Sequence, residues 1–108
     1  MTTLVRTAEG TRIVDVSGEI DLSSSSALRR LLFETLQGAE RLAVNLAGAR
    51  YIDSSGIATL IEVQKEARRV QKEMVLFALS TSARDVFALT HVTKVFRILE
   101  TEAETLKP

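Results

Sequence analysis

Apolar and polar residues follow two different periods along the first third of the chain. Residues 2–8 and 11–17 carry short apolar runs, separated by a polar pair at 9–10 that ends in glycine. Because glycine is free to take a positive φ, these two runs predict a hairpin of two strands. Residues 23–37 instead carry apolar side chains at the spacing of one helical face, and Gly38 follows as a C-terminal stop, which predicts a helix.

The rest of the chain alternates short apolar runs with helical periods. Residues 41–46 form one such run, and residues 74–79 are apolar on both faces, as expected of a strand that is covered on both sides. Four further elements are expected: helices at 54–72 and 80–89, a last strand at 95–99, and one or two helical turns at 101–106.

This order of elements predicts the α/β fold class. Strands that alternate with helices imply parallel crossovers, whereas the first hairpin is antiparallel. We therefore expect a small mixed β-sheet flanked by helices, in the order β-β-α-β-α-β-α-β with a short helical tail. The length of the chain suits a single domain of residues 1–108.

Composition and charge exclude several function classes. The chain has 14 Lys plus Arg against 14 Asp plus Glu, and its net charge of zero gives no general attraction to nucleic acid. No apolar run approaches the about 20 residues of a membrane span, and the start lacks the apolar core of a signal peptide. Since the chain also has no cysteine for disulfides, we expect a cytoplasmic protein that binds no nucleic acid and does not insert into membranes.

The residue inventory argues against intrinsic catalysis and against a bound cofactor. The only histidine, His91, has no second imidazole or thiolate to join it in a metal site. Ser54 does not lie in a Gly-x-Ser-x-Gly elbow, because Ile52 occupies the place of the first glycine. The glycines form neither a P-loop nor a dinucleotide-binding motif. We therefore expect no enzyme activity, no catalytic residue, no metal and no cofactor.

Two strand-to-helix junctions hold the candidate functional residues, at 18–21 (GEID) and 51–56 (YIDSSG). In open α/β sheets, function tends to lie where the carboxyl end of a strand turns into a helix. At the second junction, Asp53 or Ser54 can cap the helix start, and Gly56 lets the first turn pack closely. A serine hydroxyl there can also bear a phosphoryl group in the positive field of the helix N-terminus, and the two roles are compatible.

Three segments of the chain resemble a known family. Residues 16–21 (VSGEID), 51–57 (YIDSSGI) and 87–96 (FALTHVTKVF) fall in the order and at the spacing of STAS domains of the bacterial anti-sigma factor antagonist group. The resemblance covers essentially the whole chain and implies a mixed sheet flanked by helices. It also implies partner switching: the unphosphorylated protein binds an anti-sigma factor that is a serine kinase, and thereby frees a sigma factor. Phosphorylation by that kinase ends the binding, and a PP2C-type phosphatase restores it.

The resemblance implies roles for individual residues. Carried over by position, the phosphorylated residue is Ser54, which follows the aspartate of the Asp-Ser-(Ser/Thr)-Gly motif, and Ser55 is the second candidate. Asp21, at the end of the Gly-Glu-(Ile/Leu)-Asp motif, matches an acidic position beside the phosphosite that helps contact the kinase. The expected partner-binding residues are Asp21, Asp53, Ser55, Gly56 and Ile57.

Two residues depart from the family pattern. Ala58 stands where many relatives have a second glycine, and His91 stands where a glycine usually follows Ser or Thr before the last strand. Both replace a permissive residue with one that has a Cβ, so we expect an effect on loop shape or packing rather than on the switch. His91 lies in a loop that could touch a partner.

A phosphate at Ser54 gives the implied switch a physical mechanism. It would bring about −1.5 to −2 charges next to Asp53, and next to Asp21 if the two junctions share an edge of the sheet. Three acidic groups in one small area would make reassociation with the kinase costly, whereas the helix N-terminus would tolerate the phosphate within the domain. We therefore expect phosphorylation to change affinity and to leave stability nearly unchanged.

A second interpretation keeps the fold and changes the function. The domain could be a STAS scaffold or accessory subunit of a stress-signalling or lipid-transport assembly, which binds partners without a phosphorylation cycle. The short length of the chain and the intact pair of Asp53 and Ser54 favour the free-standing antagonist. Four apolar residues are candidates for the core, and they would mark a partner face if several were exposed together: Leu4, Val5, Phe87 and Val92.

Overall fold

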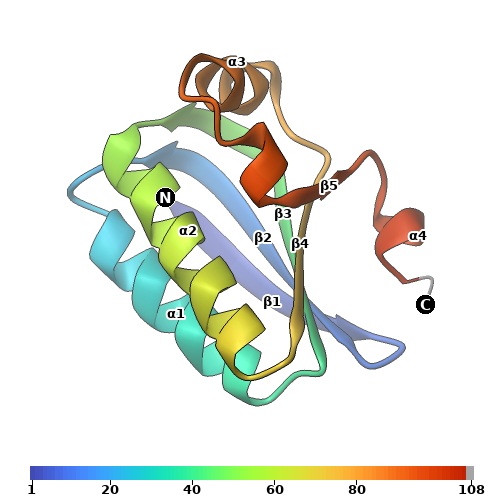
Figure 1. The fold of residues 1–108 in the computed structure, drawn as a ribbon. Helices are drawn as coiled ribbons and strands as arrows, with labels where there is room; N and C mark the ends of the chain where they lie inside the picture. Colours follow the sequence, from blue (N-terminus) through green and yellow to red (C-terminus); the bar gives the residue numbers. More distant parts are fainter. Residues whose placement is uncertain (107–108) are drawn as a thin grey trace.

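The computed structural model describes residues 1–106, which form a five-stranded sheet flanked by helices (Figure 1). The strands lie across the sheet in the order β1-β2-β3-β4-β5, so the predicted mixed α/β architecture is confirmed. The strands are β1 (Thr2–Ala8), β2 (Thr11–Ile20), β3 (Arg41–Ile52), β4 (Glu73–Phe77) and β5 (Arg97–Leu99). The helices are α1 (Ser25–Gln37), α2 (Ser54–Arg69), α3 (Thr81–Leu89) and α4 (Glu102–Thr105), and the 3-10 turn η1 (Thr93–Val95) replaces the start of the predicted last strand.

The first two strands form the predicted antiparallel hairpin. Ala8 lies opposite Thr11, and the two residues between them take φ values of 51° (Glu9) and 80° (Gly10). Two positive φ values in a two-residue loop are typical of a type I′ turn, whose twist matches that of the strands it joins. The other neighbouring strands pair in parallel, and α1, α2 and α3 lie in the crossovers between them.

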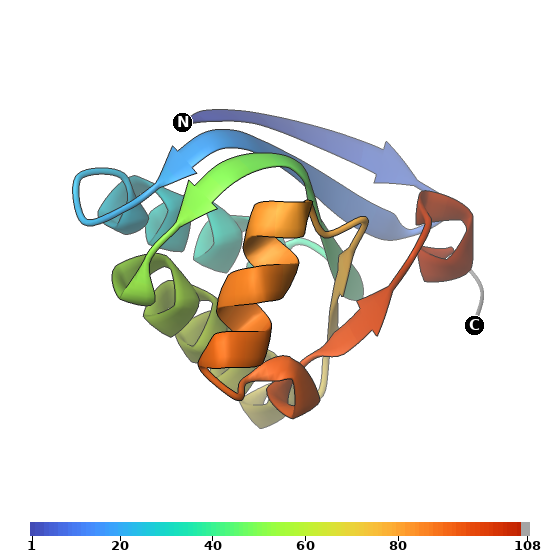
Figure 2. The same ribbon diagram turned by 90° about the horizontal axis from the view of Figure 1, so that it is seen from above.

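The two faces of the sheet are covered to different extents. α1, α2 and α3 pack on one face, over a large apolar cluster that includes Leu32, Val44 and Leu60 (Figure 2). The short helix α4 lies on the opposite face, where Leu106 packs against a smaller cluster formed by Ile13, Ala43, Val75 and Phe77. Among residues 1–106, no helix combines the length and the apolar character that crossing a membrane requires.

β4 is buried on both faces, as its apolar run predicts. Met74 and Leu76 belong to the large cluster, and Val75 and Phe77 belong to the small one on the other face. The strand ends two residues earlier than predicted because Ala78 takes a φ of 54°, which extended backbone does not allow. β4 therefore contributes side chains to both apolar clusters.

β2 and β3 run well beyond the ends that the apolar pattern predicts, to Ile20 and Ile52. Two register shifts in their pairing flank Ser17 and Gly18, and such irregularities interrupt the alternation from which a strand is predicted. Gly48 lies opposite Ser17, and a Cβ on Gly48 would lie 2.7 Å from the Cβ of Ser17. Glycine at this position thus lets the two strands stay paired up to their carboxyl ends.

An ion-pair network on the sparsely covered face ties β1, β2, β3 and α4 together. Arg6 contacts the carboxylates of Asp15 and Glu102, each at 2.7 Å. Asp15 also accepts a hydrogen bond from the side-chain amide of Asn45 at 2.8 Å. The hydrogen bonds from Arg6 hold the pKa of Asp15 below its ordinary value, although partial burial opposes them. Arg6 thus joins β1 to β2 and α4, and Asp15 extends the network to β3.

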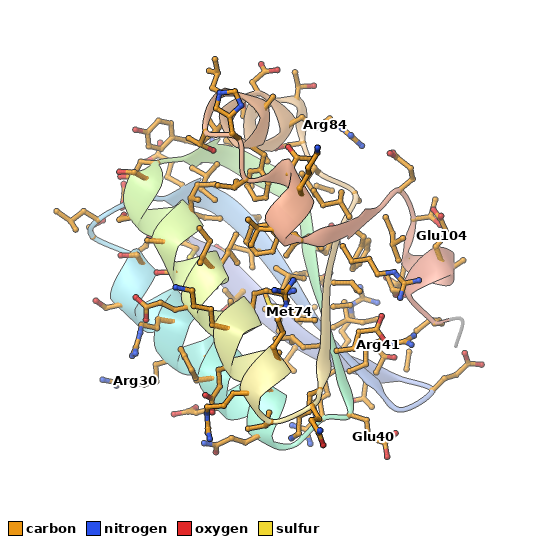
Figure 3. All side chains as sticks on the ribbon, viewed as in Figure 1. Arg30, Glu40, Arg41, Met74, Arg84 and Glu104 are labelled. Atoms are coloured by element: carbon orange, nitrogen blue, oxygen red, sulfur yellow. The ribbon has the colours of Figure 1, made fainter. Side chains whose placement is uncertain are left out.

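A second cluster fixes the start of β3 to α4. Arg41, labelled in Figure 3, pairs with Glu73 at 2.8 Å and donates to the backbone carbonyl of Thr105 at 2.6 Å. Glu73 also contacts Arg97 of β5. These contacts, together with Leu106, hold the four-residue helix α4 against the sheet.

We expect the free energy of unfolding of Asp15→Asn to change less with pH in the acidic range than that of the parent. The folded pKa of Asp15 lies below its unfolded value of about 4, so the ionised carboxylate contributes stability above that pH and loses it as the pH falls through the folded value. The variant should be less stable than the parent by about 1 kcal/mol at neutral pH, since the pair is partly exposed, and the difference should shrink at about pH 3. Urea denaturation at both pH values measures it, and a difference that stays constant contradicts the prediction.

Candidate functional site

The two junctions lie side by side at one edge of the sheet, where β2 and β3 end (upper left in Figure 1). Ile20 and Ile52 are register partners, and the backbone N–H of Asp53 donates to the carbonyl of Ile20 at 3.1 Å. The backbone N–H of Leu22 donates to the carboxylate of Asp53. The two junctions therefore share an edge of the sheet, and Asp21 and Asp53 each follow directly after one of these two paired residues.

Asp53 is the N-cap of α2. Its Oδ1 accepts hydrogen bonds from the backbone N–H groups of Ser55 and Gly56, at 2.9 and 3.2 Å, and from the Ser55 hydroxyl at 2.6 Å. The Ser55 hydroxyl above all, and then these amides, hold the pKa of Asp53 below its ordinary value against the effect of partial burial. Asp53 is therefore ionised at neutral pH and occupies two amides of the helix start.

The two serines of the motif differ in what holds them. Ser55 is half-buried, and its hydroxyl donates to Asp53 at 2.6 Å. Ser54 is exposed as the first residue of α2, and its hydroxyl has no hydrogen-bond partner within residues 1–106. Of the two candidates, Ser54 thus presents the hydroxyl that is free to meet a molecule arriving from solvent.

Gly56 and Ile57 support the motif from below the surface. Both are buried, with Ile57 only 5% exposed. A Cβ on Gly56 would lie 2.7 Å from Cγ2 of Ile20 and 2.8 Å from Cγ1 of Ile52, so glycine is needed where the helix start meets the strand ends. A contribution of Gly56 and Ile57 to binding stays a prediction, and it would act through the position of the loop. Ala58, which departs from the family pattern, faces solvent.

Asp21 closes the turn that follows β2. Its Oδ1 accepts hydrogen bonds from the backbone N–H of Ser23 at 3.0 Å and from the Ser23 hydroxyl at 2.6 Å, and this hydroxyl is the main cause that holds the pKa of Asp21 below its ordinary value. Ser24 stands at the N-cap position of α1, but its side chain does not cap the helix. Instead, the Ser24 hydroxyl donates to the carbonyl of Glu19 and accepts from the N–H of Asp21, each at 3.0 Å. It therefore ties the turn to the strand end.

Two large apolar side chains stand exposed beside these loops. Leu22 is 79% exposed in the turn after Asp21, and Tyr51 is 51% exposed on β3, opposite Glu19. Neither side chain was singled out from the sequence as a contact, although an apolar residue inside a polar turn was an available signal at Leu22. Of the four apolar residues considered for the core or for a partner face, Phe87 is buried, Val92 is half-buried, and Leu4 and Val5 are exposed.

His91 is exposed in the loop after α3. It has a φ of 58°, a left-handed conformation that costs an ordinary residue about 1–2 kcal/mol and costs glycine little. The glycine that the resemblance implies at this position would adopt the same conformation at little cost. Within residues 1–106, no group of three or more His, Cys, Asp or Glu side chains is placed to hold a metal ion.

The sequence matches one family of known domains along almost its whole length. The family profile described as "STAS domain" matches residues 2–105. The chain belongs to the STAS domain family. In this STAS domain, Asp21, Asp53, Ser54 and Ser55 lie at the edge of the sheet where β2 and β3 end.

Individual relatives of this STAS domain carry related names. A Listeria monocytogenes protein named "Anti-sigma-B factor antagonist" is 30% identical over 91 residues, which are 82% of this chain and 79% of the relative. The crystal structure of an anti-sigma factor antagonist from Mycobacterium paratuberculosis has a TM-score of 0.88 at 25% identity, covering 97% of this chain and 90% of that one. The Bacillus cell fate determinant SpoIIAA in the phosphorylated form shares the fold, with a TM-score of 0.73 at 19% identity and 95% coverage of both chains.

We expect Asp53→Ala to destabilise the STAS domain more than Asp53→Asn does. The alanine variant leaves the N–H groups of Ser55 and Gly56 without their acceptor, which should lower the free energy of unfolding by about 1 kcal/mol. Asparagine keeps an oxygen at the N-cap, so it should retain most of that stability. Urea denaturation of the two variants measures the difference, and equal losses would show that the hydrogen bonds of the cap do not matter.

Proposed function

We propose that this STAS domain is a cytoplasmic anti-sigma factor antagonist that works by partner switching. Unphosphorylated, it binds an anti-sigma factor that is a serine kinase, and a sigma factor is released. Phosphorylation of Ser54 by that kinase ends the binding, and a PP2C-type phosphatase restores it. One observation carries the proposal: the free, exposed hydroxyl of Ser54 lies at a sheet edge with two ionised carboxylates, Asp21 and Asp53. The names of the Listeria and Mycobacterium relatives support it.

The surroundings of the two serines favour Ser54 as the phosphorylated residue. A kinase must bring a phosphoryl donor against the serine oxygen, and the oxygen of Ser54 is exposed and unpartnered within residues 1–106. Modification of Ser55 would first break its 2.6 Å hydrogen bond to Asp53 and loosen the cap of α2. The domain is the substrate in this reaction, so it needs no catalytic residue, metal or cofactor of its own.

A phosphate on Ser54 would meet negative charge on its own domain. The N–H groups of Ser55 and Gly56, which could otherwise bind an anion at the helix start, already donate to Asp53. The helix would therefore favour the phosphate less than an uncapped helix would, although water can solvate a phosphate at this exposed position. A docking kinase would have to remove that water from the phosphate while Asp21 and Asp53 stay charged, and this opposes binding.

Leu22 and Tyr51 supply the attraction that the unphosphorylated domain needs. Because the chain has no net charge, general electrostatic attraction contributes little to the contact with a partner. Large apolar side chains that are exposed before binding and covered afterwards commonly carry much of the binding energy of an interface. We include Leu22 and Tyr51 in the proposed contact surface with Asp21, Asp53 and Ser54.

Phosphate mapping tests the proposal directly. The protein is incubated with ATP and each candidate serine kinase from the same organism, and the product is mapped by mass spectrometry. We expect incorporation at Ser54, its loss in Ser54→Ala and its retention in Ser55→Ala, the matched control. If no kinase modifies the parent and Ser54→Ala binds partners as the parent does, the proposed phosphorylation switch is wrong. The interpretation of the domain as a STAS scaffold or accessory subunit is then favoured.

Ser54→Asp should separate binding from stability. A negative charge beside Asp53 should weaken the complex with the cognate anti-sigma factor by at least about tenfold, or about 1.4 kcal/mol. The midpoint of thermal unfolding should hardly change, since the side chain at position 54 is exposed and makes no hydrogen bond to the described residues 1–106. Titration calorimetry and a thermal melt of the same sample make the two measurements. A loss of stability as large as the loss of binding energy contradicts the mechanism.

A further inference from the structure

The outer edge of β1 is a long strand edge that no other described element covers. β1 is the first strand in the order of the sheet, pairs only with β2, and extends over seven residues (Figure 2). The opposite edge of the sheet differs, because β5 has only three residues and is flanked by η1 and α4. Short edge strands resist pairing with another chain, whereas long ones offer a row of unpaired backbone groups.

The hairpin turn determines which backbone groups face outward. In a two-residue hairpin the residues that flank the turn, here Ala8 and Thr11, exchange hydrogen bonds, and every second residue of β1 then faces β2. The weak hydrogen bond from the Ser17 hydroxyl to the carbonyl of Thr2 agrees with this parity. The N–H and C=O groups of the alternate residues therefore point away from the sheet, and these residues are Thr3, Val5 and Thr7.

β1 lacks the devices that usually protect an exposed edge. Residues 2–8 contain no proline, and their pairing with β2 has no register shift. The single ionisable side chain of the strand, Arg6, is held by Asp15 and Glu102. Two apolar side chains of the strand are instead exposed, Leu4 by 58% and Val5 by 41%. This edge can thus accept a further strand without first removing a charge from it.

We propose that two copies of this chain associate through antiparallel pairing of their β1 strands, which makes one continuous sheet of the two. Val5 of one copy lies opposite Val5 of the other, and Thr3 lies opposite Thr7. The three outward-facing residues then exchange backbone hydrogen bonds with the same three residues of the second copy. All three are β-branched, which suits paired strands.

The strand suits a second copy of itself because the register is symmetric about Val5. On the helix-covered face of the sheet, Val5 meets Val5 and the threonines meet each other; on the opposite face, the exposed Leu4 meets the aliphatic stem of Arg6. No charge lies directly opposite a like charge in this arrangement. Two chains of zero net charge also do not repel each other as whole molecules. The inference uses no property of Ser54 and stands apart from the proposed function.

Sedimentation equilibrium of the purified protein tests the pairing. A contact limited to one strand pair is small, so we expect a reversible dimer with a dissociation constant of about 0.1 mM. Val5→Lys places two like charges opposite each other at the symmetry axis and should weaken the dimer by at least about tenfold. Val5→Thr is the matched control, since it keeps a β-branched, uncharged side chain. Leu89→Lys is the control for an added surface charge, because Leu89 is 78% exposed on α3.

Amide hydrogen exchange measured by NMR at low and high protein concentration identifies the surface involved. The amides of Thr3, Val5 and Thr7 should become protected as the dimer forms, and they should stay unprotected in a folded Val5→Lys variant. The proposal is overturned by a parent protein that stays monomeric at about 1 mM, because the expected dimer would then be the main species. It is equally overturned by a dimer that Val5→Lys leaves intact, or that forms without protection of these three amides.

Discussion

The candidate site depends on the parallel pairing of β2 and β3 up to their last residues. That pairing places Ile20 opposite Ile52, and the residue after each of them is an aspartate. It survives two register shifts because Gly48 lets β3 approach Ser17 where any larger residue would collide with it. If the pairing ended where the regular alternation ends, the two aspartates would begin separate loops, and no common edge would exist for a partner to contact.

Asp53 has two structural roles at this edge. Its carboxylate caps α2 and also holds the neighbouring turn through the N–H of Leu22. Because the same carboxylate binds the hydroxyl of Ser55, it leaves Ser54 as the only one of the two serines with a free hydroxyl among residues 1–106. A structural hydrogen-bond network thus selects between two chemically identical side chains. The role of Asp53 as a helix cap is therefore compatible with the proposed modification of Ser54.

Much of the fold could be predicted from the sequence, since local periods report it directly. The order of strands and helices, the turn at Glu9 and Gly10, and the doubly covered β4 all follow from short-range patterns. The carboxyl ends of β2 and β3 could not be predicted in this way. Register shifts interrupt the alternation of apolar and polar residues, and they depend on contacts between distant residues. The exposure of Tyr51 could not be predicted for a related reason: an apolar side chain within a strand shows no local sign of whether another element will cover it.

The fold shows how the charges that sum to a net charge of zero are distributed over the domain. Some of the charged residues pair with one another, as in the networks around Arg6 and Arg41, and these pairs link elements of the domain. Asp21 and Asp53 differ, because hydrogen bonds from hydroxyl and amide groups, not cations, keep them ionised. Within residues 1–106, neither carboxylate forms an ion pair with a cation, and both lie at the edge where Ser54 is exposed. A single phosphate on Ser54 would lower the net charge of the whole chain from zero to about −2, and nearly all of that change would lie at this edge, which is the contact surface proposed above.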